Sequence, residues 1–378
     1  MSRWLHPRPR PRALFAGVTL AVLSVALAST VSMAYPRFAA AAPELGASSS
    51  KGAPAAASLA TWSGPILATS RRGTPGTAIP AHRPKVASQS TQDEIALGVY
   101  TQDSPEPLEV HAFQQLVGRS PSIVMWYQSW SEPLFYSSQI SMVAQDGATP
   151  LITWDPELTG GVGVPLSQIV AGDYDTYIQA QAEAAASWHR TIYVRFGQEM
   201  NLSGSPFGPG VNGNTPQLFI EAWRHVVRIF RTAGATNVKW VWSPNVDCAG
   251  KCPFKAFYPG DSWVDWVGLD GYNYAAVDDV PWMSFETIFQ SSYNQLSALT
   301  SKPIMIAETA STTLGGNKAA WITKALTQTL PTEMPLVRAL VWFDVDKETN
   351  WTVNSSPASL NAFRAAVDQP LFSGTLAG

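Results

Sequence analysis

The chain has 378 residues, of which 46% are hydrophobic, only 14% are charged and 15 are Trp. The charged fraction is far below the usual quarter, so a disordered protein is excluded and a large core is expected. Residues 1–93 carry ten Lys or Arg and two acidic residues, whereas residues 94–378 carry fifteen and twenty-six. An acidic C-terminal part argues against nucleic acid as its partner.

The N-terminal segment has the pattern of an export signal. Four arginines precede an uncharged run at 13–36: Arg3, Arg8, Arg10 and Arg12. The most apolar part, 14–27, fits a signal peptide, while the whole run approaches the roughly 20 residues that span a bilayer. We expect 1–37 to be a signal peptide or an N-terminal membrane anchor, and the protein to be extracellular or anchored to the outer face of the membrane.

Residues 38–93 are rich in Ala, Ser, Gly and Pro and have almost no periodic apolar pattern. Such a composition cannot bury enough surface to offset the entropy of ordering, so we expect a disordered spacer.

After residue 93, short apolar or β-branched runs alternate with longer segments of helical character. Eight runs are predicted to be strands: 95–100, 122–128, 150–154, 191–196, 238–243, 266–272, 303–308 and 338–344.

Helical signals lie between these strands. Thr215 and Pro216 form an N-cap and first-turn pair, apolar residues follow at helical spacing, and Gly234 marks the end. The same signals predict helices near 105–117, 174–188, 317–329 and 358–368. Strands alternating with helices predict a single (β/α)8 TIM barrel over 94–378, of the α/β class. The alternative, a doubly wound open sheet, lacks a G-x-G-x-x-G after its first strand.

In such a barrel the active site lies at the C-terminal ends of the strands. These ends carry acids, amides and tryptophans, and the five His residues lie elsewhere. A Ser-His-Asp triad or a His-rich metal centre is therefore not expected, and we predict no metal and no cofactor.

This inventory fits glycoside hydrolysis, which needs two carboxyl groups on either side of an acetal. Glu199 and Glu308 end strands on opposite sides of the barrel, and Arg195 lies near Glu199. Tryptophans offer flat faces that suit sugars. Each glutamate could instead be a loop salt-bridge partner, and tryptophans could simply pack between barrel and helices.

Six motifs in order carry a family resemblance: RFGQEMN (195–201), ITWDP (152–156), WVWSPN (240–245), WVGLDGYNY (266–274), KPIMIAETAS (302–311) and VWFDVDKETNW (341–351). Together they resemble glycoside hydrolase family 26, which contains β-mannanases, β-glucanases and β-xylanases. The resemblance covers nearly all of 94–370.

The resemblance implies a retaining mechanism, with Glu199 as acid/base and Glu308 as nucleophile. It also implies that Tyr272 hydrogen-bonds the nucleophile and that Trp342 forms an aromatic floor beside the scissile sugar. The full set of predicted substrate-binding residues is Arg195, Asn201, Trp154, Trp242, Tyr272 and Trp342.

Two positions depart from the family pattern. Many members have His before the acid/base, where this chain has Gln198. The aromatic-rich loop of mannanases is here 202–210, in which Phe207 is the only aromatic residue. We therefore do not expect the mannan-binding platform to be retained.

Cys248 and Cys252 follow the fifth strand. In an exported protein this pair is most simply a small disulfide, because a metal site would need ligands that the region lacks.

We expect an exported, monomeric, endo-acting retaining β-glycosidase that cleaves β-mannan, β-glucan or β-xylan, with its two carboxyl groups about 5–5.5 Å apart. The alternatives are a non-catalytic carbohydrate-binding pseudoenzyme with the same barrel, and a Schiff-base lyase that uses Lys239.

Overall fold

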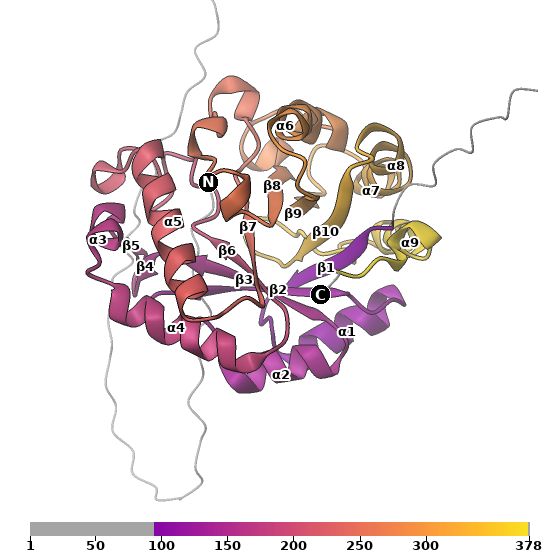
Figure 1. Ribbon diagram of the computed structural model, residues 1–378. Helices are drawn as coiled ribbons and strands as arrows, with labels where there is room; N and C mark the ends of the chain where they lie inside the picture. The colour runs from indigo at the N-terminus through magenta and orange to yellow at the C-terminus, as the bar shows by residue number, and fades with distance from the viewer. Residues whose placement is uncertain (1–93, 377–378) are drawn as a thin grey trace, which may run out of the picture. The chain divides into compact units, whose positions relative to one another are not determined.

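The computed structural model describes residues 94–376, and parallel strands form a closed barrel at their centre (Figure 1). Around the barrel the strand order is β1-β10-β9-β8-β7-β6-β3-β2. The strands are β1 (Ala96–Thr101), β2 (Ile123–Ser129), β3 (Thr149–Asp155), β6 (Ile192–Phe196), β7 (Val238–Trp242), β8 (Trp266–Asn273), β9 (Ile304–Ser311) and β10 (Val337–Asp344). The predicted α/β barrel is confirmed, and the open sheet is excluded because β1 pairs with β10.

Helices lie outside the barrel and connect most of its strands (Figure 1). They are α1 (Pro107–Val117), α2 (Ser137–Gln145), α3 (Leu166–Ala171), α4 (Asp175–Trp188), α5 (Pro216–Thr232), α6 (Phe285–Leu299), α7 (Lys318–Lys324), α8 (Leu330–Glu333) and α9 (Pro357–Val367). A π-helical turn, Ala325–Thr329, joins α7 to α8. At the start of α5, the Thr215 hydroxyl accepts a hydrogen bond from the Leu218 N–H, which confirms the predicted N-cap.

Two connections depart from the strand–helix alternation. A short hairpin, β4 (Glu157–Leu158) and β5 (Val162–Gly163), follows β3. Between β7 and β8 the chain forms three 3-10 turns: Cys248–Gly250, Lys255–Phe257 and Asp261–Trp263. The predicted cysteine pair lies in this second connection: Cys248 begins the first 3-10 turn and Cys252 follows that turn.

Alternate residues of each strand face two different apolar cores. The inner core fills the barrel and includes Met125, Leu151, Tyr193, Val241 and Met305. The outer core lies between the strands and the helices, and includes Ile152, Val194 and Leu269. Both faces of the sheet are therefore buried, as expected for a parallel barrel, and the strands read as continuous apolar runs.

The predicted leader at 1–37 and spacer at 38–93 lie outside the described residues. No helix within residues 94–376 has the length and apolar character of a membrane span.

Candidate active site

Glu199 lies in a tight turn immediately after β6. Gly197 and Glu199 both have left-handed backbone angles, with φ of 55° and 52°. Such angles are uncommon for a residue with a side chain and are found where the surrounding structure holds a functional group in place. The Glu199 N–H donates to the Ser243 carbonyl at 2.9 Å, which ties the turn to the end of β7.

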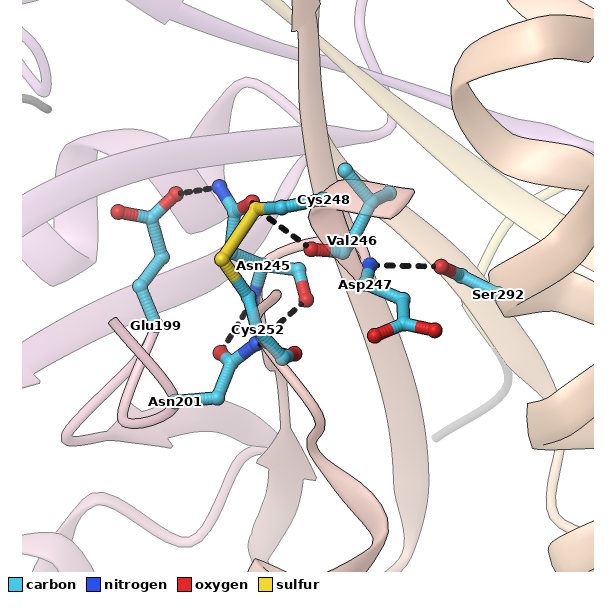
Figure 2. Close-up of a disulfide and its surroundings, with 8 residues drawn as sticks. All are labelled: Glu199, Asn201, Asn245, Val246, Asp247, Cys248, Cys252 and Ser292. Atoms are coloured by element: carbon cyan, nitrogen blue, oxygen red, sulfur yellow. Dashed lines mark hydrogen bonds between the residues drawn. A yellow bond between two sulfur atoms is a disulfide. The ribbon is translucent and has the colours of Figure 1, made fainter. Parts of the chain in front are cut away.

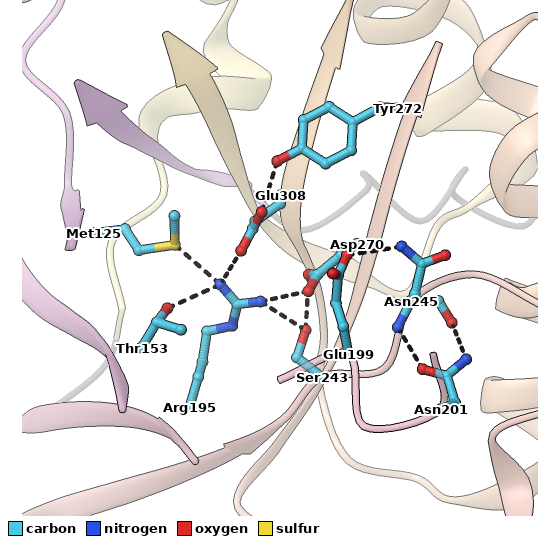
Figure 3. Close-up of polar contacts among 10 residues, drawn as sticks. All are labelled: Met125, Thr153, Arg195, Glu199, Asn201, Ser243, Asn245, Asp270, Tyr272 and Glu308. Carbon is cyan, nitrogen blue, oxygen red and sulfur yellow. Dashed lines mark hydrogen bonds and ion pairs between the residues drawn. The ribbon is translucent and has the colours of Figure 1, made fainter. Parts of the chain in front are cut away.

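Glu308, on β9, is held by two hydrogen-bond donors (Figure 3). Arg195 Nη1 donates to Oε1 at 2.7 Å and the Tyr272 hydroxyl donates to Oε2 at 2.6 Å. Burial, and then the charge of Glu308, raise the pKa of Tyr272 well above its usual value, so the hydroxyl keeps its proton and can donate. The contact expected between Tyr272 and this glutamate is confirmed.

Arg195 is fully buried inside the barrel and joins two acids. Its Nη2 donates to Asp270 Oδ2 at 2.5 Å, and its Nη1 also donates to the Thr153 hydroxyl at 3.1 Å. Burial opposes its charge, but Asp270 and Glu308 outweigh this effect and raise the pKa of Arg195. Ser243 completes the network by donating to Asp270 Oδ1 at 2.9 Å.

The two glutamates have different environments. Glu199 Oε1 accepts one hydrogen bond, from Asn245 Nδ2 at 2.7 Å. Burial, followed by the charge of Glu308, raises the pKa of Glu199 to about 7. A carboxyl that retains its proton near neutral pH beside a carboxylate held by Arg195 is the division of roles that an acid and a nucleophile require.

Two of the predicted substrate-binding residues have a different role in the structure. The Asn201 amide is buried and fully used: it pairs with the Asn245 backbone through two bonds of 2.9 Å and donates to the Cys252 carbonyl at 2.7 Å. Arg195, with no exposed surface, contacts the acids rather than open space. Both residues therefore support the glutamates, and neither is available to a sugar.

The three predicted tryptophans also lie away from the mouth of the barrel. Trp154, Trp242 and Trp342 have no exposed surface and belong to the outer core. Trp154 packs against Phe230, Trp242 against Tyr258 and Trp342 against Phe363, on the helix-facing side of their strands. The expectation that they contact substrate is corrected: Trp154 and Trp342 pack the barrel against α5 and α9, and Trp242 packs it against the connection between β7 and β8.

Aromatic residues that sequence reasoning missed face inward near Glu308. Tyr100 on β1 and Tyr127 on β2 are partly exposed, and their rings lie 5.0 Å apart. The charge of Glu308 acts on the hydroxyls of both, which places them at the same site. Strand parity could have identified them, because they continue the inner-facing series Ala96 and Ile123 of their strands.

Two further buried polar side chains lie near the mouth. Asp155 ends β3 on the inner-facing series, and Gln198 precedes Glu199. Burial, and then the nearby Glu157, raise the pKa of Asp155 well above its usual value, while Arg195 and, to a lesser extent, the neighbouring Gln198 amide oppose the rise.

Cys248 and Cys252 form the expected disulfide, with their Cα atoms 5.3 Å apart (Figure 2). Over residues 94–376, no group of three or more His, Cys, Asp or Glu residues has an arrangement that could hold a metal ion. Lys239, proposed in the lyase alternative, is the second residue of β7 and so lies at the opposite end of the strand from Glu199 and Ser243.

Known proteins resemble this chain in sequence and in fold. The model of glycosyl hydrolase family 26 matches residues 172–327, which contain Glu199 and Glu308. Endoglucanase H of Acetivibrio thermocellus is 37% identical over 279 residues, which are 72% of this chain and 30% of that protein. A β-1,3-xylanase of a Vibrio species is 30% identical over 131 residues, 32% of this chain and 25% of that protein.

Among solved structures, a modular endo-β-1,4-mannanase from Cellulomonas fimi aligns with a TM-score of 0.56 at 17% identity, covering 74% of this chain and 71% of that one. At this identity the likeness concerns the fold. The barrel belongs to glycoside hydrolase family 26. The chain spans less than a third of the length of the two curated relatives described above.

Proposed function

We propose that residues 94–378 form the catalytic domain of a retaining β-glycosidase, with Glu308 as nucleophile and Glu199 as acid/base. The observation that carries this proposal is the difference in hydrogen bonding and pKa between two buried carboxyl groups. Glu308 faces two donors, Arg195 and Tyr272, whereas Glu199 has one amide donor and a pKa of about 7.

In the first step, a Glu308 oxygen attacks the anomeric carbon as the bond to the leaving oxygen breaks. Glu199 gives its proton to that oxygen, which departs as a hydroxyl group. Arg195 and Tyr272 orient the attacking carboxylate. In the second step, Glu199, now ionised, removes a proton from water, and the water oxygen displaces Glu308 from the sugar. The two inversions restore the starting configuration.

We infer that the substrate is a β-linked polysaccharide. Tyr100 and Tyr127 supply partly exposed aromatic faces beside Glu308, which suit the faces of sugar rings. The 37% identity to Endoglucanase H supports β-glucan as the first substrate to test. Phe207, the only aromatic residue of the 202–210 loop, is buried, so that loop offers no aromatic platform for mannan.

We also propose export. The basic and apolar N-terminal pattern motivates it, and the Cys248–Cys252 disulfide supports it, because disulfides persist in oxidising compartments. Cell fractionation of the full chain, followed by N-terminal sequencing, would test export and distinguish a cleaved leader from a membrane anchor.

Incubation with mixed-linkage β-glucan, mannan and xylan tests the activity. We expect the wild type to release reducing sugar from at least one of them and Glu308→Ala to release none, with product sizes distinguishing endo from exo action. Binding of a polysaccharide by both proteins without release of reducing sugar would instead favour the carbohydrate-binding alternative.

A further inference from the structure

The disulfide lies beside the residues that contact the candidate acid/base (Figure 2). Each of its two residues contacts a different asparagine. The Cys252 carbonyl accepts a hydrogen bond from Asn201 Nδ2 at 2.7 Å, and Cys248 Sγ lies 3.5 Å from Asn245 Oδ1. Two residues, Asn201 and Asn245, therefore connect Cys252 to Glu199, and one residue, Asn245, connects Cys248 to Glu199.

Asn201 and Asn245 connect the disulfide loop, residues 247–252, to Glu199 (Figures 2 and 3). Asn201 Oδ1 accepts from the Asn245 N–H, and Asn201 Nδ2 donates to the Asn245 carbonyl, both at 2.9 Å. Asn245 Nδ2 then donates to Glu199 Oε1 at 2.7 Å. Because Asn201 is only two residues after Glu199, these contacts close a ring that joins the turn after β6 to the loop after β7.

The far side of the disulfide loop is fixed to a helix. The Asp247 N–H donates to Ser292 Oγ on α6 at 2.9 Å, and Gln295 Nε2 donates to Asp247 Oδ2 at 2.8 Å. The short turn between the cysteines is closed by the Cys252 N–H donating to the Asp247 carbonyl at 3.0 Å. The disulfide and these hydrogen bonds thus hold the Cys252 carbonyl at a fixed position relative to α6, and this carbonyl in turn holds Asn201.

We propose that the Cys248–Cys252 disulfide and Asn201 are positioning elements for the acid/base, which hold Asn245 with its amide nitrogen toward Glu199. The inference rests on the role proposed for Glu199. A side-chain amide has a donor end and an acceptor end, and only the donor end suits a carboxylate oxygen. With Oε1 occupied by Asn245, Oε2 is the oxygen that carries the proton for the leaving group.

Other groups that act on Glu199 come from the strands of the barrel. The charged and titratable ones are Glu308 on β9, Arg195 on β6, and Asp270 and Tyr272 on β8. None of them contacts the disulfide loop through its side chain in the hydrogen bonds found for residues 94–376. A change confined to Asn201 or the disulfide should therefore reach Glu199 through Asn245.

Kinetics with two leaving groups test the proposal. In C248S/C252S and in Asn201→Ala, we expect kcat/KM on the polysaccharide cut by the wild type to fall about tenfold, part of the contribution of general acid catalysis. The kcat/KM of a 2,4-dinitrophenyl β-glycoside of the same sugar should change less than about twofold, because this leaving group needs little protonation. Equal losses on both substrates would overturn the proposal.

A titration that needs no substrate separates this inference from the proposed function. The hydrogen bond from Asn245 lowers the pKa of Glu199, so its loss should raise that pKa by about half a unit in 13C NMR of the glutamate carboxyl carbons. An unmoved Glu199 pKa in a folded variant would overturn the inference. Failure of the wild type to cut any polysaccharide would refute the function and leave this readout intact.

Matched controls are present in the chain. Asn237→Ala removes a similar amide that bridges the Ala185 and Arg190 carbonyls just before β7, and should leave the Glu199 pKa unchanged. Reduction of the wild type with a phosphine should reproduce the C248S/C252S phenotype and reverse on reoxidation, while C248S/C252S itself should not respond. Asn201→Ala retains both cysteines and covers the case in which C248S/C252S does not fold.

Discussion

Arg195 and Glu308 form a buried ion pair across the inside of the barrel, with Nη1 2.7 Å from Oε1 and almost no exposed surface on either side chain. They come from β6 and β9, which are not neighbours in the barrel. The same guanidinium also pairs with Asp270. One cation therefore compensates two buried acids, and its removal affects both the fold and the chemistry.

Arg195→Met should destabilise the barrel by about 3–5 kcal/mol, because it leaves Glu308 and Asp270 buried without a cation. Arg195→Lys should retain part of the stability but lose at least about tenfold in kcat, since an ammonium cannot donate to both acids with the geometry of the guanidinium fork. Denaturant unfolding and kcat on the cleaved polysaccharide measure the two effects. Wild-type kcat in a folded Arg195→Lys would show that Arg195 does not orient the nucleophile.

Activity should fall as pH rises through about 7. The first step needs protonated Glu199, whose pKa burial and Glu308 raise to about 7, so the active form is present below that pH and lost above it. The pH profile of kcat/KM gives this limb directly. Glu199→Gln should abolish the limb on a dinitrophenyl glycoside; a limb that persists in this variant would have to be assigned to another group.

The same shift predicts how stability depends on pH. Because the folded pKa of Glu199 lies above its unfolded value, the folded state binds more protons between about 4.5 and 7, and its stability decreases as pH rises through that window. Glu199→Gln removes this loss. The free energy of unfolding of Glu199→Gln minus that of the wild type should therefore increase by up to about 3 kcal/mol from pH 4 to pH 8, measured by urea unfolding. A difference independent of pH would contradict the raised pKa.

The aromatic assignments can be tested as a pair. Tyr100→Ala removes a partly exposed ring beside Glu308 and should raise KM about fivefold or more, since aromatic faces contribute about 1 kcal/mol beyond the area they bury. Trp242→Phe alters the outer core, where Trp242 packs against Phe254 and Tyr258, and should lower Tm with KM unchanged. A raised KM with an unchanged Tm in Trp242→Phe would instead indicate that Trp242 contacts the substrate.

The sequence predicted the barrel because its strands and helices differ in period and length, and it predicted the glutamates because strand ends converge at one face. It could not assign the tryptophans. A parallel strand buried on both faces has no polar alternation, so nothing in PLITW or VKWVWS tells which side Trp154 or Trp242 faces. The register shifts opposite Leu269/Asp270 and Leu340/Trp342 both place an extra residue on β9, so inner-facing Ala307 is followed directly by Glu308, which also faces inward.

The role of Asn201 was beyond sequence reasoning for another reason. Its partners, Asn245 and Cys252, are 44 and 51 residues away, and only the folded loops bring them together. The motif placed Asn201 at the site but could not distinguish contact with a sugar from contact with backbone.

The central claim is that Glu308 forms a covalent bond to the substrate sugar. Incubation with a 2-deoxy-2-fluoro β-glycoside of the sugar that the enzyme cleaves, carrying a good leaving group, should trap that intermediate, since the fluorine slows its hydrolysis. Peptide mass spectrometry should then find one glycosyl adduct, on Glu308, and none in Glu308→Ala. An adduct on another residue, or products of inverted configuration without any adduct, would contradict the account.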